Sequence, residues 1–294
     1  MSNIVLCNIG SDSLSKINSE DLKIKNLYLS IGEKSFGPHG LSLYNDKILV
    51  ANNYNNSISL INLNQFKEEK NLYIGAHPND LVAHNNMVYV TCGESNSVIV
   101  YDLINERVNF ELPTGRSPHS IELLKNENLA FVSNMNENSI AVIDCNKNNI
   151  IKRIIVGDNP IKIKISKKKK YLYVCMSYIG YDTEGYVGII SLKTLELIVK
   201  IKVGLAPVDL FEDDNYLYVS NFGSGYISVI NLNNFGEESK ISVGGMPRGI
   251  VKLNEKIYIG DYLNGSLKIV DTKKKSIKSI LIGIEPNDMI IINE

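Results

Sequence analysis

The chain has 294 residues, of which 31 are basic and 32 acidic, and its formal net charge is −1. A balanced charge leaves no electrostatic footprint for nucleic acid or for an anionic membrane surface, so we expect neither as a partner. No apolar run is long enough for a transmembrane helix, and the amino terminus has no basic leader. The sequence therefore predicts a soluble, cytoplasmic protein.

The first residues along the chain have a partial repeat pattern. Residues 4–32 (IVLCNIGSDSLSKINSEDLKIKNLYLSIG) align with ILVANNYNNSISLINLNQFKEEKNLYIG, which belongs to the next copy. The amino-terminal copy lacks the short apolar run that precedes this pattern in the other copies. It is therefore an incomplete repeat.

A Gly-x-x-Pro motif then recurs about every 40 residues. It occurs as GAHP, GRSP, GDNP, GLAP, GGMP and GIEP, and a degenerate copy ends at Pro38. The copies begin near Pro38, Pro78, Pro118, Pro160, Pro207 and Pro247, and a last motif ends at Pro286. A period of about 40 residues is typical of propeller repeats.

Each copy contains four runs with alternating polarity. A short apolar run follows the proline, then come a run such as KILVANN or YLYVSNF, a run such as SISLINL or YISVINL, and a closing run such as NLYIG or SKISVG. Alternation with period 2 and many β-branched residues predict strands. Four short antiparallel strands in each copy describe one propeller blade.

The two ends of the chain complement each other. Residues 286–294 (PNDMIIINE) supply the first strand that residues 1–32 lack. The sequence therefore predicts an all-β, seven-bladed β-propeller formed by one domain, residues 1–294, with four antiparallel strands per blade. In this fold the carboxy-terminal strand joins the amino-terminal blade and closes the ring, which removes open strand edges.

Two segments resemble a known repeat family. SIAVIDCNKNNIIKRIIVGDNPIKIKISKKKKYLYVCMS and YLYVSNFGSGYISVINL are similar to the YVTN-type (YncE-like) β-propeller repeat, which runs Tyr-Val-x-Asn, then a Val-Ile-Asp strand, then Val-Gly-x-x-Pro. The resemblance covers essentially the whole chain. It implies a seven-bladed ring of the kind found in binding or scaffolding modules.

The two positions after each proline vary among the blades, whereas the third is always apolar. Because loops before the inner strands meet at the channel mouth, these variable positions are the candidate ligand-binding residues. The polar ones chosen are Asn79, Asp80, Asp209, Arg248, Asn287 and Asp288, together with His39 and His119 as candidate catalytic groups.

One hypothesis for this mouth is a metal site. His39, Asp80 and His119 are residue types that bind Ca, Mg or Mn, and a bound cation would polarise a carbonyl or activate water while a histidine acts as general base. The alternative is that polar residues bond to the local backbone at strand starts, while His and Arg fill the mouth.

The fourth complete copy has a longer loop than the others. The segment SYIGYDTEGY (177–186) brings Tyr178 and Tyr181 to the same face, and Phe222 and Tyr262 occupy the equivalent loops of the next two blades. Tyrosines on a glycine-containing loop are typical of recognition surfaces. These residues predict an aromatic patch, and the competing interpretation is that the rings only cover blade edges.

Together these observations favour a binding or interaction module that uses its channel-mouth face to bind a small molecule or a protein partner. The alternative is a metal-dependent lyase or hydrolase, such as a lactonase, with a divalent cation at the mouth. It would be similar in architecture to virginiamycin B lyase, although the chain has no catalytic motif of such enzymes.

Overall fold

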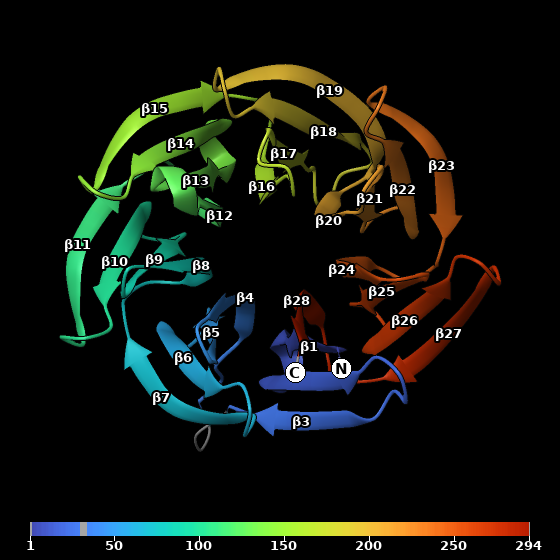
Figure 1. Cartoon of the computed structure of the whole chain (residues 1–294), viewed down its shortest axis with the longest axis horizontal. Helices are drawn as coiled ribbons and strands as arrows, with labels where there is room; N and C mark the ends of the chain where they lie inside the picture. The colour runs from blue at the N-terminus through green and yellow to red at the C-terminus, as the bar shows by residue number, and fades with distance from the viewer. Residues whose placement is uncertain (1, 30–33, 294) are drawn as a thin grey trace.

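The computed structural model describes residues 2–29 and 34–293 and forms a ring of blades around a central channel (Figure 1). The described residues contain seven four-stranded antiparallel sheets, which confirms the predicted all-β, seven-bladed propeller. Parts of the predicted seventh blade, residues 1, 30–32 and 294, lie outside the described residues, as does Glu33 before the Pro38 motif. Three-residue helical turns are also present, η1 (Ile9–Ser11), η2 (Lys125–Glu127) and η3 (Met135–Glu137). No described helix is long or apolar enough to cross a membrane.

Seven inner strands surround the channel, and each begins at the proline of its copy. They are β4 (Pro38–Tyr44), β8 (Pro78–His84), β12 (Pro118–Leu124), β16 (Pro160–Ile165), β20 (Pro207–Glu212), β24 (Pro247–Leu253) and β28 (Pro286–Asn293). Proline has no N–H to donate to a sheet, so the first residue of a strand is one of the few places where it fits. The repeated proline therefore places the residues that follow it at the start of the channel wall.

The second and third strands of each blade are its most buried part. The second strands are β5 (Lys47–Asn52), β9 (Met87–Cys92), β13 (Leu129–Asn134), β17 (Tyr171–Met176), β21 (Tyr216–Asn221), β25 (Lys256–Asp261) and β1 (Ser2–Asn8). The third strands are β6 (Ser57–Asn62), β10 (Ser97–Asp102), β14 (Ser139–Asp144), β18 (Glu184–Ser191), β22 (Tyr226–Asn231), β26 (Ser266–Asp271) and β2 (Ser13–Asn18). Their apolar side chains are covered on both faces by neighbouring blades.

Outer strands form the rim of the ring and are largely exposed. They are β7 (Lys67–Tyr73), β11 (Arg107–Pro113), β15 (Asn149–Ile155), β19 (Glu196–Leu205), β23 (Gly236–Ser242), β27 (Ser276–Leu281) and β3 (Ile24–Tyr28). Charged residues are frequent in them, as in KEEKNLY of β7. Charges on edge strands discourage pairing with other chains.

The ring closes in the seventh blade, where the sheet order is β28-β1-β2-β3. β28 pairs antiparallel with β1, with Ile4 opposite Ile291. The Ser2 hydroxyl donates to Asn293 Oδ1 at 2.9 Å, and the two termini lie side by side (Figure 1). The predicted closure by the carboxy-terminal strand is confirmed.

The hydrophobic core is divided among the interfaces between blades. The described residues form seven buried clusters, and each cluster combines side chains of two adjacent blades. One of them joins the seventh and first blades through Val5, Ile48 and Ile292. Burial of each aliphatic side chain stabilises by about 1.5–3 kcal/mol. No blade buries its own faces alone, so stability depends on the closed ring.

The Gly-x-x-Pro turns are held by one repeated backbone hydrogen bond. In each blade the carbonyl before the proline accepts the N–H of the first residue after the second strand, as from Gly93 to His77 at 3.1 Å and from Phe222 to Ala206 at 2.9 Å. This bond joins the inner-strand turn to the loop between the second and third strands. Both loops therefore lie on one face of the ring, as predicted.

The extended loop of the fourth complete copy is shorter than predicted. β18 begins at Glu184, so the loop covers residues 177–183. Tyr186 pairs with Met176 in the sheet and is not a loop residue. The strand EGYVGIIS begins two residues before Tyr186, so residues 184–186 belong to β18 and their assignment to the loop was wrong.

Candidate functional site

The first residue after each blade proline lies at one end of the channel, here called the upper mouth. His39, Asn79, His119, Ile161, Val208, Arg248 and Asn287 surround a narrow cavity of about 30 Å³ there. Six of the seven second residues line the same cavity, among them Asp80, Asp209 and Asp288. The structure therefore brings together all eight inner-strand residues that the sequence selected.

Four of these side chains each form a hydrogen bond to the next blade, and together they join blades seven, one, two, three and four. His39 Nδ1 donates to the Asn79 carbonyl at 2.8 Å, and His119 Nδ1 donates to the Ile161 carbonyl at 2.8 Å. Asn79 Nδ2 donates to the Pro118 carbonyl at 3.1 Å, and Asn287 Nδ2 donates to the His39 carbonyl at 2.8 Å. The alternative to a metal site was that polar residues at strand starts bond to the backbone, and these four side chains do so.

The two imidazoles lie against each other. Their ring centroids are 5.4 Å apart at an interplanar angle of 79°. Because a carbonyl can only accept, each Nδ1 carries the proton and each Nε2 has a free lone pair. Burial, with the positive charge of Arg248, lowers the pKa of His119 to about 4, and burial also lowers the pKa of His39. Both rings are therefore neutral at pH 7, and a catalytic role for either stays a prediction.

Arg248 occupies the opposite side of the mouth from the two histidines. Its guanidinium carbon lies 5.3 Å from the Tyr262 ring centroid and 5.8 Å from that of Phe222. The two rings contact each other at a centroid distance of 5.5 Å. Phe222 and Tyr262, which lie in different loops, thus form an aromatic pair next to the Arg248 guanidinium, here called the Phe222–Tyr262 shelf.

Three aspartates of the second position each accept a backbone N–H from the next blade. Asp80 accepts from Ile121 at 3.3 Å, Asp209 from Ile250 at 3.0 Å and Asp288 from Leu41 at 2.9 Å. The Ser120 hydroxyl also donates to Asp80 at 2.9 Å. These carboxylates therefore join neighbouring inner strands as well as lining the channel.

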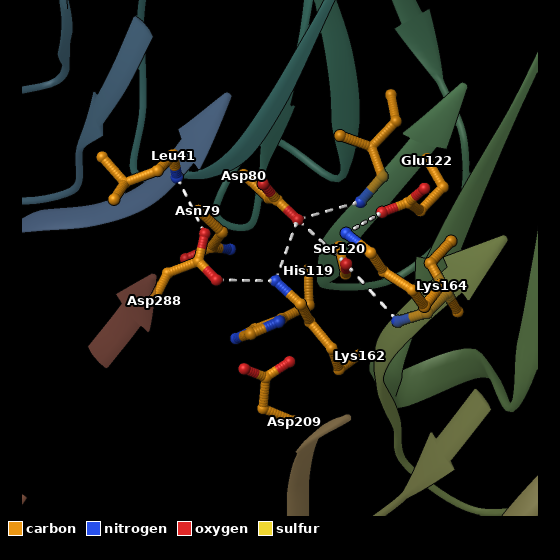
Figure 2. A network of polar contacts seen from close by, with 12 residues as sticks. Leu41, Asn79, Asp80, His119, Ser120, Glu122, Lys162, Lys164, Asp209 and Asp288 are labelled. Carbon is orange, nitrogen blue, oxygen red and sulfur yellow. Dashed lines mark hydrogen bonds and ion pairs between the residues drawn. The ribbon is translucent and has the colours of Figure 1, made fainter. Parts of the chain in front are cut away.

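Lys162 forms ion pairs with two of these carboxylates and lines the channel at the same level. Its Nζ lies 3.1 Å from Asp288 Oδ1 and 3.9 Å from Asp80 Oδ2, and Figure 2 shows the ammonium between them. Burial opposes the charge, but Asp288, Asp80 and Asp209 raise the pKa of Lys162 above its ordinary value. Burial raises the pKa of Asp80 and of Asp209 to about 6, although Lys162 acts in the opposite direction.

Lys162 was not among the residues selected from the sequence. The signal for it was present, because it is the only basic residue at the second position after a proline, where three blades carry Asp.

Two blades carry glycine at this second position. A Cβ on Gly40 would lie 2.6 Å from the Asn79 carbonyl oxygen, and one on Gly249 would lie 2.1 Å from that of Asn287. Close approach of adjacent inner strands therefore requires glycine at these two positions.

Within the described residues, the three proposed metal ligands do not meet as one group, and a metal role for them stays a prediction. Among residues 2–29 and 34–293, no three His, Cys, Asp or Glu side chains are grouped as a metal ion requires. His39 and His119 meet, but Asp80 uses both oxygens for Leu81, Ser120 and Ile121. The carboxylate is therefore oriented toward the next blade and Lys162.

The two loop tyrosines lie apart from this cavity. Tyr178 donates its hydroxyl hydrogen to Asp158 Oδ2 at 2.7 Å, which ties the loop to the neighbouring turn. Tyr181 is 73% exposed. Neither residue lines the upper mouth. The Phe222 and Tyr262 rings do not line the cavity either, but they contact Arg248, which does.

No protein-family model and no curated protein matches the chain. Solved structures do match it. A functionally unknown protein from Desulfotomaculum acetoxidans has a TM-score of 0.81 at 13% identity, over 98% of each chain. A putative 6-phosphogluconolactonase from Bacteroides fragilis has a TM-score of 0.77 at 14% identity, over 99% of this chain and 98% of that one. Virginiamycin B lyase from Staphylococcus aureus has a TM-score of 0.72 at 17% identity, over 88% of this chain and 90% of that one. At these identities the likeness shows the propeller fold alone.

Proposed function

We propose that this protein is a ligand-binding propeller of the YVTN (YncE-like) type and that its upper mouth binds a small organic anion. The repeat pattern supports the family assignment, since Val-Gly-x-x-Pro and Tyr-Val-x-Asn recur at the same positions of successive blades. Virginiamycin B lyase and a putative lactonase share the fold, so the scaffold is compatible with small-molecule ligands.

The observation that carries this proposal is the state of Arg248. Its guanidinium is partly buried at the mouth, yet within the described chain no hydrogen bond or ion pair joins it to a protein acceptor. Arginine has five N–H donors in a rigid fork that matches a carboxylate or phosphate. Polar groups removed from water without a partner are costly, so an anionic ligand satisfies this side chain.

The surroundings of Arg248 indicate how such a ligand lies. The cavity is only about 30 Å³, so the charged head group enters it and the remainder of the molecule stays outside. Phe222 and Tyr262 offer ring faces to an aromatic or apolar body. On the other side, the free Nε2 atoms of His39 and His119 accept hydrogen bonds from ligand hydroxyl groups. The mouth thus favours an anion with a flat body.

Isothermal titration with benzoate and with inorganic phosphate tests the proposal. We expect binding of benzoate that Arg248→Gln weakens at least about tenfold, since hydrogen bonds to charged groups contribute about 1.5–3 kcal/mol. The matched control is Arg107→Gln on outer strand β11, which should bind like the wild type. His119→Asn should keep the fold, because Asn79 and Asn287 show that asparagine at this position can donate to the next blade, but it removes the imidazole from the mouth. The proposal would be contradicted if neither benzoate nor phosphate binds, or if Arg248→Gln binds benzoate as tightly as the wild type.

A further inference from the structure

A second and larger cavity lies beyond Lys162, at the opposite end of the channel. This lower chamber has a volume of about 370 Å³ and is lined mainly by the third to fifth residues after the inner-strand prolines. Asp80, Lys162, Asp209 and Asp288 line both cavities and separate them. Ligand pockets typically begin at roughly 300 Å³. The chamber is therefore large enough for a small organic molecule.

The walls of the chamber are mostly apolar. Leu43, Val82, Phe211, Val251 and Ile290 contribute side chains from five different blades. The third and fourth complete blades contribute an ion pair to the wall, since Lys164 Nζ lies 3.0 Å from Glu122 Oε1 (Figure 2), and the exposed Lys125 also lines the chamber. The walls thus favour the body of an apolar ligand and leave charge recognition to the floor.

Asp209 on the floor differs from the other two aspartates. Lys162 forms ion pairs with Asp80 and Asp288, whereas in the described part of the chain no cation lies within ion-pair distance of Asp209. Asp209 is only 7% exposed, and its oxygens accept the N–H groups of Leu210 and Ile250. A carboxylate has about four acceptor sites, so capacity remains after these two bonds. Its negative charge lacks a direct counterion.

An aromatic ring lies on the same face as this carboxylate. Phe211 is two residues after Asp209 on β20, and both side chains line the lower chamber. Side chains two apart on a strand point to the same side. A ring beside a carboxylate is the combination that attracts an organic ammonium ion, through ion pairing and the negative face of the ring. One cation of the chain, Lys167, already lies near this ring, with its Nζ 5.8 Å from the Phe211 centroid.

We propose that the lower chamber binds a small organic cation, with its ammonium group against Asp209 and Phe211 and its apolar body along Leu43 and Val251. Charge complementarity with Asp209 selects a cation, and the apolar walls select an organic one. This second site is distinct from the upper mouth, although Asp209 lines both cavities.

Titration of the full chain with three probes of matched size tests this site. The probes are phenethylammonium, phenethyl alcohol and phenylacetate, which are cationic, neutral and anionic. We expect phenethylammonium to bind most tightly at pH 7.5. Asp209→Asn should weaken it at least about tenfold, in line with the cost of removing one partner of a buried charge pair. Asp182→Asn, in the exposed loop between β17 and β18, removes the same charge away from the chamber, so it is the matched control and should not change the affinity.

A second variant keeps the test valid if Asp209→Asn fails to fold. Phe211→Leu retains an apolar side chain but removes the ring, and should weaken phenethylammonium by roughly 3- to 30-fold, the range of a cation–π contact. Binding of phenethyl alcohol should be almost unchanged in this variant. The proposal is overturned if no probe binds, if the alcohol or phenylacetate binds as tightly as the amine, or if both variants retain wild-type affinity.

The pH dependence gives an independent readout. Burial raises the pKa of Asp209 and of Asp80 to about 6. The affinity for phenethylammonium should therefore fall as pH decreases from 7.5 through 6, because these carboxylates become neutral while the amine stays charged. The other ionisable groups that line the chamber are Asp288, Glu122, Lys125, Lys162 and Lys164. An affinity that rises on acidification would contradict the role of Asp209.

Discussion

Lys162 shows how one side chain organises the channel. A single ammonium ion on β16 contacts carboxylates from the second and seventh blades, which are far apart in the sequence. Each of those carboxylates also accepts a backbone N–H from a further blade. Buried charges of this kind are stable only as a set, because loss of one partner leaves another charge buried and unpaired.

Replacement of Lys162 by methionine should therefore destabilise the protein by about 3–5 kcal/mol at pH 7.5. Without the ammonium, the pKa values of Asp80 and Asp209 rise further above the unfolded value. The folded state then binds more protons than the unfolded state, so part of the lost stability returns as pH falls toward 5. Urea unfolding at pH 7.5 and pH 5.5 measures both effects.

The control for this substitution is Lys168→Met in the exposed turn between β16 and β17. It removes the same charge and should leave the free energy of unfolding almost unchanged at either pH. Equal stability of Lys162→Met and the wild type at pH 7.5 would show that the channel carboxylates do not depend on this lysine.

At the scale of elements, the strand with the greatest influence is β28. It supplies the inner strand of a blade whose other three strands are at the opposite end of the chain. Met289 packs in the cluster shared with the sixth blade, and Ile292 in the cluster shared with the first. Loss of β28 therefore opens two interfaces as well as one sheet edge.

Deletion of residues 286–294 should lower the midpoint of thermal unfolding and make the transition broader, because the ring can no longer close. A milder version is Ile292→Ala, for which we expect a loss of about 2–5 kcal/mol from the cavity left in the cluster. Ile155→Ala on β15, where the side chain is 72% exposed, is the matched control and should have little effect. A truncated chain that unfolds like the wild type would contradict closure by β28.

At the scale of the whole molecule, the ring has no unique starting blade. Each hydrophobic cluster joins two adjacent blades, and the termini already lie next to each other. Closely spaced termini make circular permutation feasible. What distinguishes the native arrangement is that one blade contains strands from both ends of the chain.

Two circular permutants test whether this shared blade matters. New termini between Lys168 and Lys169 place β16 at the carboxy terminus and β17 at the amino terminus, which recreates the native type of closure in another blade. New termini between Gly75 and Ala76 fall between blades, so no strand pairing joins the ends. We expect the first permutant to have the higher midpoint in calorimetry. Equal midpoints would show that packing between blades alone holds the ring together.

The sequence by itself determined the fold and the positions of the channel residues. A proline about every 40 residues sets the start of each inner strand, and alternation with period 2 sets which side chains follow one another along the wall. These are local properties of the chain, so His39, Asp80, His119 and Arg248 were correctly expected near one another. The partial repeat at each end was sufficient to predict closure.

Only the tertiary structure decided what these residues contact. The Asp80 carboxylate could face the backbone of the next blade or the two histidines of the mouth. The twist and spacing of the blades decide between these, and no local sequence pattern contains that information. The same geometry placed Lys162 between the Asp80 and Asp288 carboxylates and opened a lower chamber beside Asp209. It also left Arg248 without a protein acceptor among the described residues. Contacts across a ring join residues more than a hundred positions apart, so they follow from the closed shape.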